Sequence, residues 1–301
     1  MKDTSARMKC SDSGSVLQDG ASSWRAIFVF VSLSFVWAWG VGLAAGQAAT
    51  SSPTLNFALM VSAGFGPSLA ALVVVAVFSA PAGFRAWVIR CLNWRLGSGW
   101  YLLAFLAPPT LMVCALALHA ALGGALPAFP AASQIPLVIA NFGLVLLIGG
   151  PLGEEFGWRG YLMPALTARM NWRAASLVIG IVWGLWHLPL FFIVGTPQAR
   201  MPIAVFLLNI LAGSVLFGWL FERTKRSVLP ALVLHTSLNA FADVLAIVPT
   251  ATTAQPYMLV TPLLVCVAAV LLIRPDRPPV NSRVTPHGNS FLSRHRDRTV
   301  K

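Results

Sequence analysis

Six polar side chains interrupt long apolar runs of this sequence, and their types suit proton transfer and hydrogen bonding to a single oxygen. They are Glu154, Glu155, Arg159, His187, His235 and Asn239. A charged side chain within a membrane-spanning helix costs about 2.5–3.5 kcal/mol, so residues of this kind usually serve a site or a pathway. Carboxylate and imidazole groups are the side chains that most often act as general bases. The set predicts a polar site at membrane depth.

Glu154 and Glu155 are adjacent, so on a helix they point about 100° apart and cannot share one role. Arg159 follows Glu155 by four residues. With the glutamate on the N-terminal side, this spacing favours an ion pair within the helix. We therefore predict that Arg159 neutralises Glu155, and that Glu154, which faces elsewhere, is the candidate base.

Four of the polar residues are predicted at compatible depths. If the helix that carries Glu154 ends before Pro164, Glu154 lies about 14 Å from the cytoplasmic end of that helix, at 1.5 Å per residue. The same count places His235 at about 10 Å, Asn239 at about 17 Å and His187 at about 20 Å. His235 and Asn239, spaced i, i+4, share one helix face and can present two donors to one oxygen. We expect all four side chains to meet in one cavity reached from the cytoplasmic side.

Two pairs of glycines flank this predicted site. Gly153 and Gly157 form one GxxxG pair, and Gly180 and Gly184 form another. Small residues at this spacing let helix backbones approach closely in a membrane. We interpret both pairs as packing features.

The composition excludes an ordinary soluble domain. Of 301 residues, 57% are hydrophobic and only 10% are charged, whereas soluble domains carry about 25% charged residues. The net charge is +12, but the basic residues lie in tails and short loops rather than on one polar face, so nucleic-acid binding is not indicated. The four cysteines are widely spaced and form no CxxC pair, which gives no sign of a disulfide scaffold.

The apolar runs predict an all-α, polytopic transmembrane helix bundle of about eight spans. The expected spans are 26–45, 57–78, 99–122, 137–163, 174–194, 203–221, 228–247 and 256–273. In this arrangement every Lys and Arg except Arg200 falls on one side of the membrane. Because Lys and Arg stay preferentially on the cytoplasmic side, both termini are expected to be cytoplasmic. The expected location is the cell inner membrane, with an uncleaved first span.

Five segments follow from this organisation. We expect a cytoplasmic N-terminal tail at 1–25, accessory transmembrane helices at 26–135, a catalytic transmembrane core at 136–247, a last transmembrane helix at 248–273 and a disordered basic C-terminal tail at 274–301. The C-terminal tail is rich in Pro, Ser and Arg and has little to bury.

Three motifs in this order resemble those of the CPBP family, the CAAX proteases and bacteriocin-processing enzymes. They are EEFGWR at 154–159, WGLWH at 183–187 and HTSLN at 235–239, which match the family patterns EExxxR, FxxxH and HxxxN. The resemblance covers about residues 140–245. One departure is visible, since Trp183 stands where the family pattern has phenylalanine. The large aromatic ring is expected to fill the same packing position.

The resemblance implies an intramembrane endopeptidase that hydrolyses peptide bonds of membrane-associated or CAAX-like substrates. Glu154, assisted by His187, would activate a water molecule. His235 and Asn239 would stabilise the oxyanion of the tetrahedral intermediate, and Arg159 would orient Glu155. The implied partners are a peptide or membrane-protein substrate and the lipid bilayer. The sequence gives no indication of oligomeric state.

A role for zinc is left open by the sequence. Glu154, His187 and His235 form a plausible zinc set, and the family is commonly called metalloproteases. The HExxH helix signature is absent, and a glutamate-activated water suffices without a metal. We therefore favour a site without tightly bound zinc.

Two other functions are compatible with the same residues. Intramembrane Glu, His and Asp side chains also form proton relays in proton-coupled or small-solute transporters. However, the outer half of the expected spans offers only Asp243 and His119 to such a pathway. A non-proteolytic membrane partner or immunity-type protein on the same fold is the remaining alternative.

Overall fold

The computed structural model describes residues 20–49, 51–128, 134–248 and 255–275, and these residues form helices without any β-strand. The predicted all-α class is thereby confirmed for this part of the chain. Most of the two predicted tails, at 1–19 and 276–301, lies outside the described residues.

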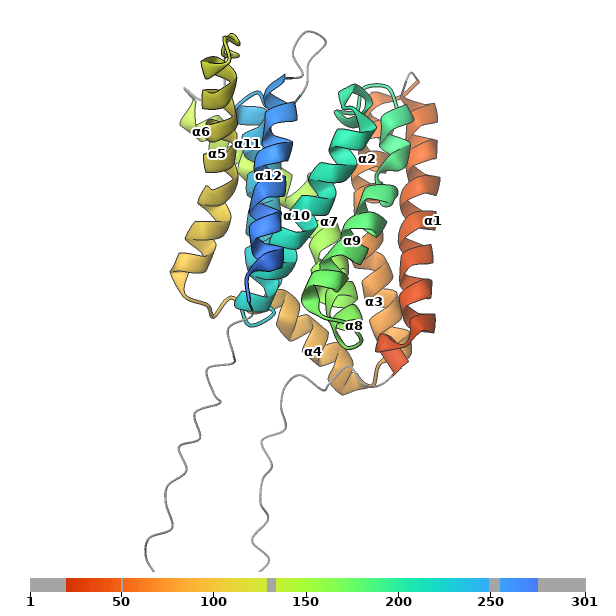
Figure 1. The fold of residues 1–301 in the computed structure, drawn as a ribbon. Coiled ribbons are helices and arrows are strands. Elements are labelled where there is room, and N and C mark those ends of the chain that lie inside the picture. The colour runs from red at the N-terminus through yellow and green to blue at the C-terminus, as the bar shows by residue number, and fades with distance from the viewer. Residues whose placement is uncertain (1–19, 50, 129–133, 249–254, 276–301) are drawn as a thin grey trace, which may run out of the picture.

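The principal helices pack side by side in a bundle (Figure 1). They are α1 (Trp24–Ala48), α2 (Pro53–Gly64), α3 (Gly66–Phe78), α4 (Pro81–Leu92), α5 (Ser98–Ala121), α6 (Ile135–Ile148), α7 (Pro151–Gly157), α8 (Met163–Thr167), α9 (Trp172–Trp186), α10 (Ile203–Arg223), α11 (Leu229–Val244) and α12 (Gln255–Ile273). Helix α4 lies across the end of the bundle where α1 begins and α12 ends (Figure 1).

Among the described residues, five helices are long and apolar enough to cross a membrane, and up to seven spans result if each of two bent helix pairs counts as one. The multi-span bundle is therefore as expected, but the count of eight is not confirmed. The expected span at 228–247 corresponds to α11, which has 16 residues. At 1.5 Å per residue α11 is about 24 Å long, shorter than the hydrocarbon core of about 30 Å.

The two bent pairs replace expected continuous spans. Helices α2 and α3 are bent by 45°, and α6 is bent by 43° relative to the segment Pro151–Thr167. Both breaks precede a proline, Pro67 in the first and Pro151 in the second. Proline lacks the N–H that would continue the helical ladder, and its ring clashes with the preceding turn. At the second break Gly150 adopts a φ of +103°, a left-handed conformation that favours glycine.

From the sequence we expected the helix with the paired glutamates to end before Pro164. The structure shows that it does not. It continues through a π-helical turn at Trp158–Leu162 into α8, which ends at Thr167. In an α-helix, residue 164 would donate its N–H to the carbonyl of Gly160, which proline cannot do. Here Nη1 of Arg90, on α4, donates to that carbonyl at 2.9 Å, so the helix passes the proline without an orphaned acceptor.

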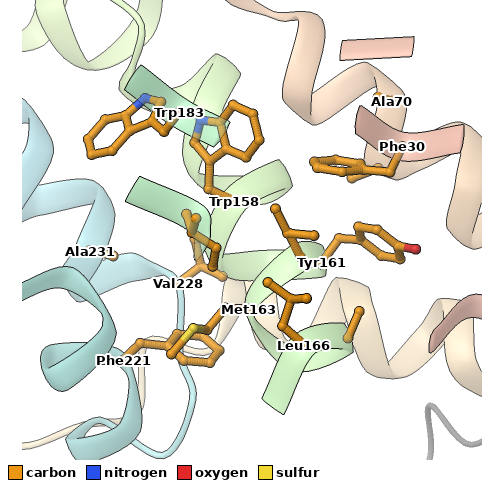
Figure 2. Close-up of a cluster of buried hydrophobic side chains, with 14 of the residues drawn as sticks. Phe30, Ala70, Trp158, Tyr161, Met163, Leu166, Trp183, Phe221, Val228 and Ala231 are labelled. Carbon is orange, nitrogen blue, oxygen red and sulfur yellow. The ribbon is translucent and has the colours of Figure 1, made fainter. Parts of the chain in front are cut away.

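The largest buried cluster of apolar side chains surrounds this segment (Figure 2). Trp158 and Tyr161 are fully buried, and Phe30 of α1 packs on both of their rings. The Tyr161 hydroxyl donates to the carbonyl of Ala21 at 2.7 Å. The cluster fixes the helix that carries the glutamates against the start of α1.

The two glycine pairs mark close helix contacts, as predicted. A Cβ at Gly153 would collide with the backbone of Gly64, and one at Gly157 would collide with Pro67. These glycines let α7 pack against the junction of α2 and α3. In α9, a Cβ at Gly180 would lie 2.9 Å from Leu211 of α10, so the second pair serves the packing of α9 against α10.

Candidate active site

One cavity of about 530 Å³ brings together the four residues that were predicted to meet. Glu154, His187, His235 and Asn239 all line it. Glu154 comes from α7, His187 directly follows α9, and the other two come from α11. Helix α9 ends at Trp186, and a short 3₁₀ helix with Pro189 near its start follows. The end of α9 thus places His187 in the cavity.

The predicted ion pair between Glu155 and Arg159 is present and buried. Nη1 of Arg159 lies 2.9 Å from Oε1 of Glu155, and the exposed fractions of these side chains are 1% and 0%. The guanidinium carbon of Arg159 lies 4.6 Å from the ring centre of Trp183 and 4.1 Å from that of Phe217. Two aromatic faces therefore hold the cation at the depth of the glutamate.

The same oxygen of Glu155 is shared by a third residue. Nδ1 of His235 lies 2.8 Å from Oε1 of Glu155. Because an ionised carboxylate only accepts hydrogen bonds, we assign the Nδ1 proton to His235, which leaves Nε2 as the nitrogen available to the cavity. A carboxylate that fixes the tautomer and orientation of an imidazole is a recurring support for functional histidines. This contact was not predicted from the sequence.

Glu154 lies in a separate environment from Glu155. It is 4% exposed, and its Oε2 accepts hydrogen bonds from two indoles, Nε1 of Trp183 at 2.5 Å and Nε1 of Trp158 at 3.4 Å. Figure 2 shows these two indoles beside each other at one edge of the apolar cluster. The other oxygen, Oε1, lies beside Gly150, where an added Cβ would come within 2.7 Å. The two adjacent glutamates therefore have different partners, as their angular separation predicted.

His187 and Asn239 each bond to a backbone carbonyl. Nδ1 of His187 lies 2.8 Å from the carbonyl oxygen of Trp183, which fixes the Nδ1–H tautomer and leaves Nε2 unused by that bond. Nδ2 of Asn239 donates to the carbonyl of Gly149 at 3.3 Å. Asn239 is therefore tied to the break between α6 and α7, next to the glycine that faces Glu154.

The residues present do not form a ready zinc site. Within the described parts of the chain, no three His, Cys, Asp or Glu side chains gather closely enough to hold a metal ion. This includes the set suggested by the sequence, namely Glu154, His187 and His235.

Three contributors to the site were missed from the sequence. The spacing of Trp158, four residues after Glu154, places both on one helix face, and this signal was available. Trp183 attracted notice only as a departure from a motif, although its indole N–H is a donor that needs a partner when buried. The role of Gly150 depends on the bend between α6 and α7, which hydropathy does not reveal.

Comparisons with known proteins find similarity over this part of the chain. Residues 136–241 match a family described as type II CAAX prenyl endopeptidase, Rce1-like. The chain is also similar to CAAX prenyl protease 2 of Methanococcus maripaludis, with 31% identity over 136 residues, which cover 43% of this chain and 48% of that protein. The chain thus spans about half the length of this curated relative. The part of the chain that holds the three motifs is therefore similar to the Rce1-like family of type II CAAX prenyl endopeptidases.

Proposed function

We propose that this chain is an intramembrane endopeptidase that hydrolyses a peptide bond with a glutamate-activated water. The observation that carries the proposal is the single cavity lined by Glu154, His187, His235 and Asn239. Its support comes from the family match over residues 136–241. The similar archaeal protein is named a CAAX prenyl protease, which points to the same class of reaction.

In the proposed reaction, Glu154 is the general base. A water molecule in the cavity gives a proton to the carboxylate of Glu154 while its oxygen attacks the carbonyl carbon of the scissile bond. His187, held through Nδ1 by the Trp183 carbonyl, orients this water with its remaining ring nitrogen. As the C–O bond forms, the carbonyl π electrons move to oxygen and create an oxyanion. Collapse of the intermediate breaks the C–N bond, and the departing amine takes the proton from Glu154.

The oxyanion is proposed to rest against His235 and Asn239. When His235 is protonated on both nitrogens, Nδ1–H stays on Glu155 and Nε2–H is free to donate to the oxyanion. The amide of Asn239 supplies a second donor from the same face of α11. Donors that are already held in place require little reorganisation as the negative charge develops, which is why such sites stabilise transition states strongly. Glu155 and Arg159 act here as supports of His235.

The proposed substrates are peptides or proteins associated with the membrane, including CAAX-like C-termini. Most of the cavity wall is apolar and includes Phe57, Met60 and Val61 of α2. An apolar wall around a few polar groups is typical of sites that bind a largely hydrophobic ligand. The lining therefore suits an extended peptide segment that arrives from the bilayer.

We also propose an even number of crossings, with both termini in the cytoplasm and the chain in the cell inner membrane. Nε of Arg169 donates to the carbonyl of Ser22 near the start of α1, and Nε of Arg173 donates to the carbonyl of Leu272 near the end of α12. The turn before α9 and the first turn of α9 thus contact both described ends of the chain, which favours an even count. Seven spans by length together with the shorter α11 would give eight.

The experiment that tests the protease assignment maps protein termini in membranes from cells that express the wild type or the Glu154→Ala variant at matched levels. New termini that appear only with the wild type are expected, and they would also identify the substrate sequence. Glu222→Ala is a matched control, because Glu222 is partly exposed, pairs with Arg226 at 3.1 Å and does not line the cavity. If wild-type and Glu154→Ala membranes give the same termini at good depth, the protease assignment fails.

A further inference from the structure

The two oxygens of Glu154 have unequal surroundings. Oε2 receives both indole N–H groups, that of Trp183 at 2.5 Å and that of Trp158 at 3.4 Å. Among the described residues none donates a hydrogen bond to Oε1, which lies beside Gly150 instead. An added Cβ at Gly150 would stand only 2.7 Å from Oε1, so the glycine leaves this side of the carboxylate uncrowded.

The position of Trp183 is itself tightly set. Its ring stacks on the guanidinium of Arg159 at 4.6 Å and packs edge-to-face near the rings of Phe217 and His235. With an exposed fraction of 3%, the indole has no room to turn towards solvent. Its carbonyl also holds Nδ1 of His187 at 2.8 Å. One residue therefore contacts both members of the proposed water-activating pair.

From this geometry we infer that Trp183 is a positioning residue for the proposed base, and that Oε1 of Glu154 is the oxygen that takes the proton from water. The indole N–H holds Oε2, which stops the carboxylate from rotating and presents Oε1 to the cavity beside Gly150. A hydrogen bond to a charged acceptor is stronger than one between neutral groups, so this contact is suited to fixing one rotamer. The inference rests on the proposed function, since it assigns the working oxygen of the same glutamate.

The test measures kcat and KM of the full chain in proteoliposomes, with an internally quenched S-farnesyl CAAX peptide as the probe. Where terminus mapping identifies another cleavage sequence, the peptide that spans this sequence is used instead. The Trp183→Phe variant is expected to lower kcat about tenfold and to change KM by less than about twofold, because loss of a hydrogen bond to a charged group acts on the base and not on substrate binding. Trp158→Phe is expected to have a smaller effect, in line with its longer contact.

Two controls separate the hydrogen bond from packing. Trp37→Phe removes an indole that donates to the carbonyl of Ser62 at 2.8 Å and does not line the cavity, so it is expected to keep wild-type kinetics. Replacement of Trp183 by benzothienylalanine keeps the shape of the bicyclic ring and deletes only the N–H donor. This variant is expected to lose as much kcat as Trp183→Phe. Wild-type kcat in the benzothienylalanine variant would overturn the inference and assign any defect of Trp183→Phe to packing.

A double-mutant cycle tests whether Trp183 acts through Glu154. In a Glu154→Asp background the shorter carboxylate cannot reach the indole, so Trp183→Phe is expected to lower the remaining kcat by less than about threefold. An equal tenfold loss in both backgrounds would contradict the inference while leaving the protease assignment intact. If the wild type cleaves no peptide and generates no termini, the proposed function fails and the inference falls with it.

Discussion

Nδ1 of His235 lies 2.8 Å from Oε1 of Glu155, although 80 positions separate the two residues in the chain. The same oxygen receives Nη1 of Arg159. This contact joins α7 to α11 beside the cavity that His235 lines, and it assigns Glu155 a role that its neighbour Glu154 does not share. Glu155, between an arginine and a histidine, is suited to hold His235 in place. Glu154, which lines the cavity and accepts hydrogen bonds from two indoles, is suited to act as the base.

The two glutamates are therefore expected to respond differently to the same substitution. Glu155→Gln leaves Arg159 as a buried cation without its counter-charge and should lower the free energy of unfolding by about 3–5 kcal/mol. Glu154→Gln keeps an acceptor for the indoles and should change stability by less than about 1 kcal/mol, while it abolishes peptide cleavage. Unfolding in detergent, followed by tryptophan fluorescence alongside activity, measures both quantities. Equal stability losses in the two variants would contradict the division of roles.

Arg159 is predicted to be irreplaceable by lysine. Its guanidinium lies over the rings of Trp183 and Phe217, and a planar cation stacks on aromatic faces in a way that an ammonium group does not. Arg159→Lys should keep the charge yet lower kcat/KM about tenfold, because His235 loses the fixed orientation of Glu155. Arg85→Lys on α4 is the matched control, since Arg85 is exposed. Wild-type kcat/KM in Arg159→Lys would show that charge alone suffices.

The sequence predicted contacts within one helix better than contacts between helices. The pair of Glu155 and Arg159 followed from an i, i+4 spacing, which acts within a single element. The common cavity followed from depth, since helical rise converts residue counts into distances along the membrane normal. The contact of His235 with Glu155 depends on how α7 and α11 rotate against each other, and hydropathy carries no information about that rotation. The bends between helices at Phe65 and Gly150 were missed for a similar reason. The length of an apolar run predicts the length of a span but not the direction in which its helix points.

The passage of the helix through Pro164 depends on Arg90, and this dependence can be tested. Burial lowers the pKa of Arg90 to about 10, so the side chain is still charged at neutral pH and its bond to the Gly160 carbonyl is charge-assisted. Arg90→Ala should lower the free energy of unfolding by about 1–3 kcal/mol, since it leaves that carbonyl without a donor.

The compensating variant is Pro164→Ala, which restores a backbone N–H to the turn. In the Arg90→Ala background it should recover part of the lost stability, measured by thermal unfolding in one detergent. Arg85→Ala, an exposed change on the same helix, is expected to alter stability by less than about 0.5 kcal/mol. If Pro164→Ala lowers stability equally with and without Arg90, the Gly160 carbonyl does not couple Arg90 to Pro164.

Two constraints act on Gly150, a positive φ and the lack of space beside Glu154, and a comparison with Gly195 separates them. Its φ of +103° disfavours any side chain, and a Cβ would also crowd Oε1 of Glu154 at 2.7 Å. Gly195 has a similar φ of +93° but nothing within 4 Å of an added Cβ. Both Gly150→Ala and Gly195→Ala should therefore incur the backbone cost of about 1–2 kcal/mol. Only Gly150→Ala should also lower kcat, because its methyl group pushes Oε1 out of the position where water is deprotonated. The expected loss is about tenfold or more, as for other displaced catalytic groups. Parallel measurements of thermal unfolding and of kcat for the two variants check this, and equal kcat in both would mean that the space beside Oε1 has no bearing on the reaction.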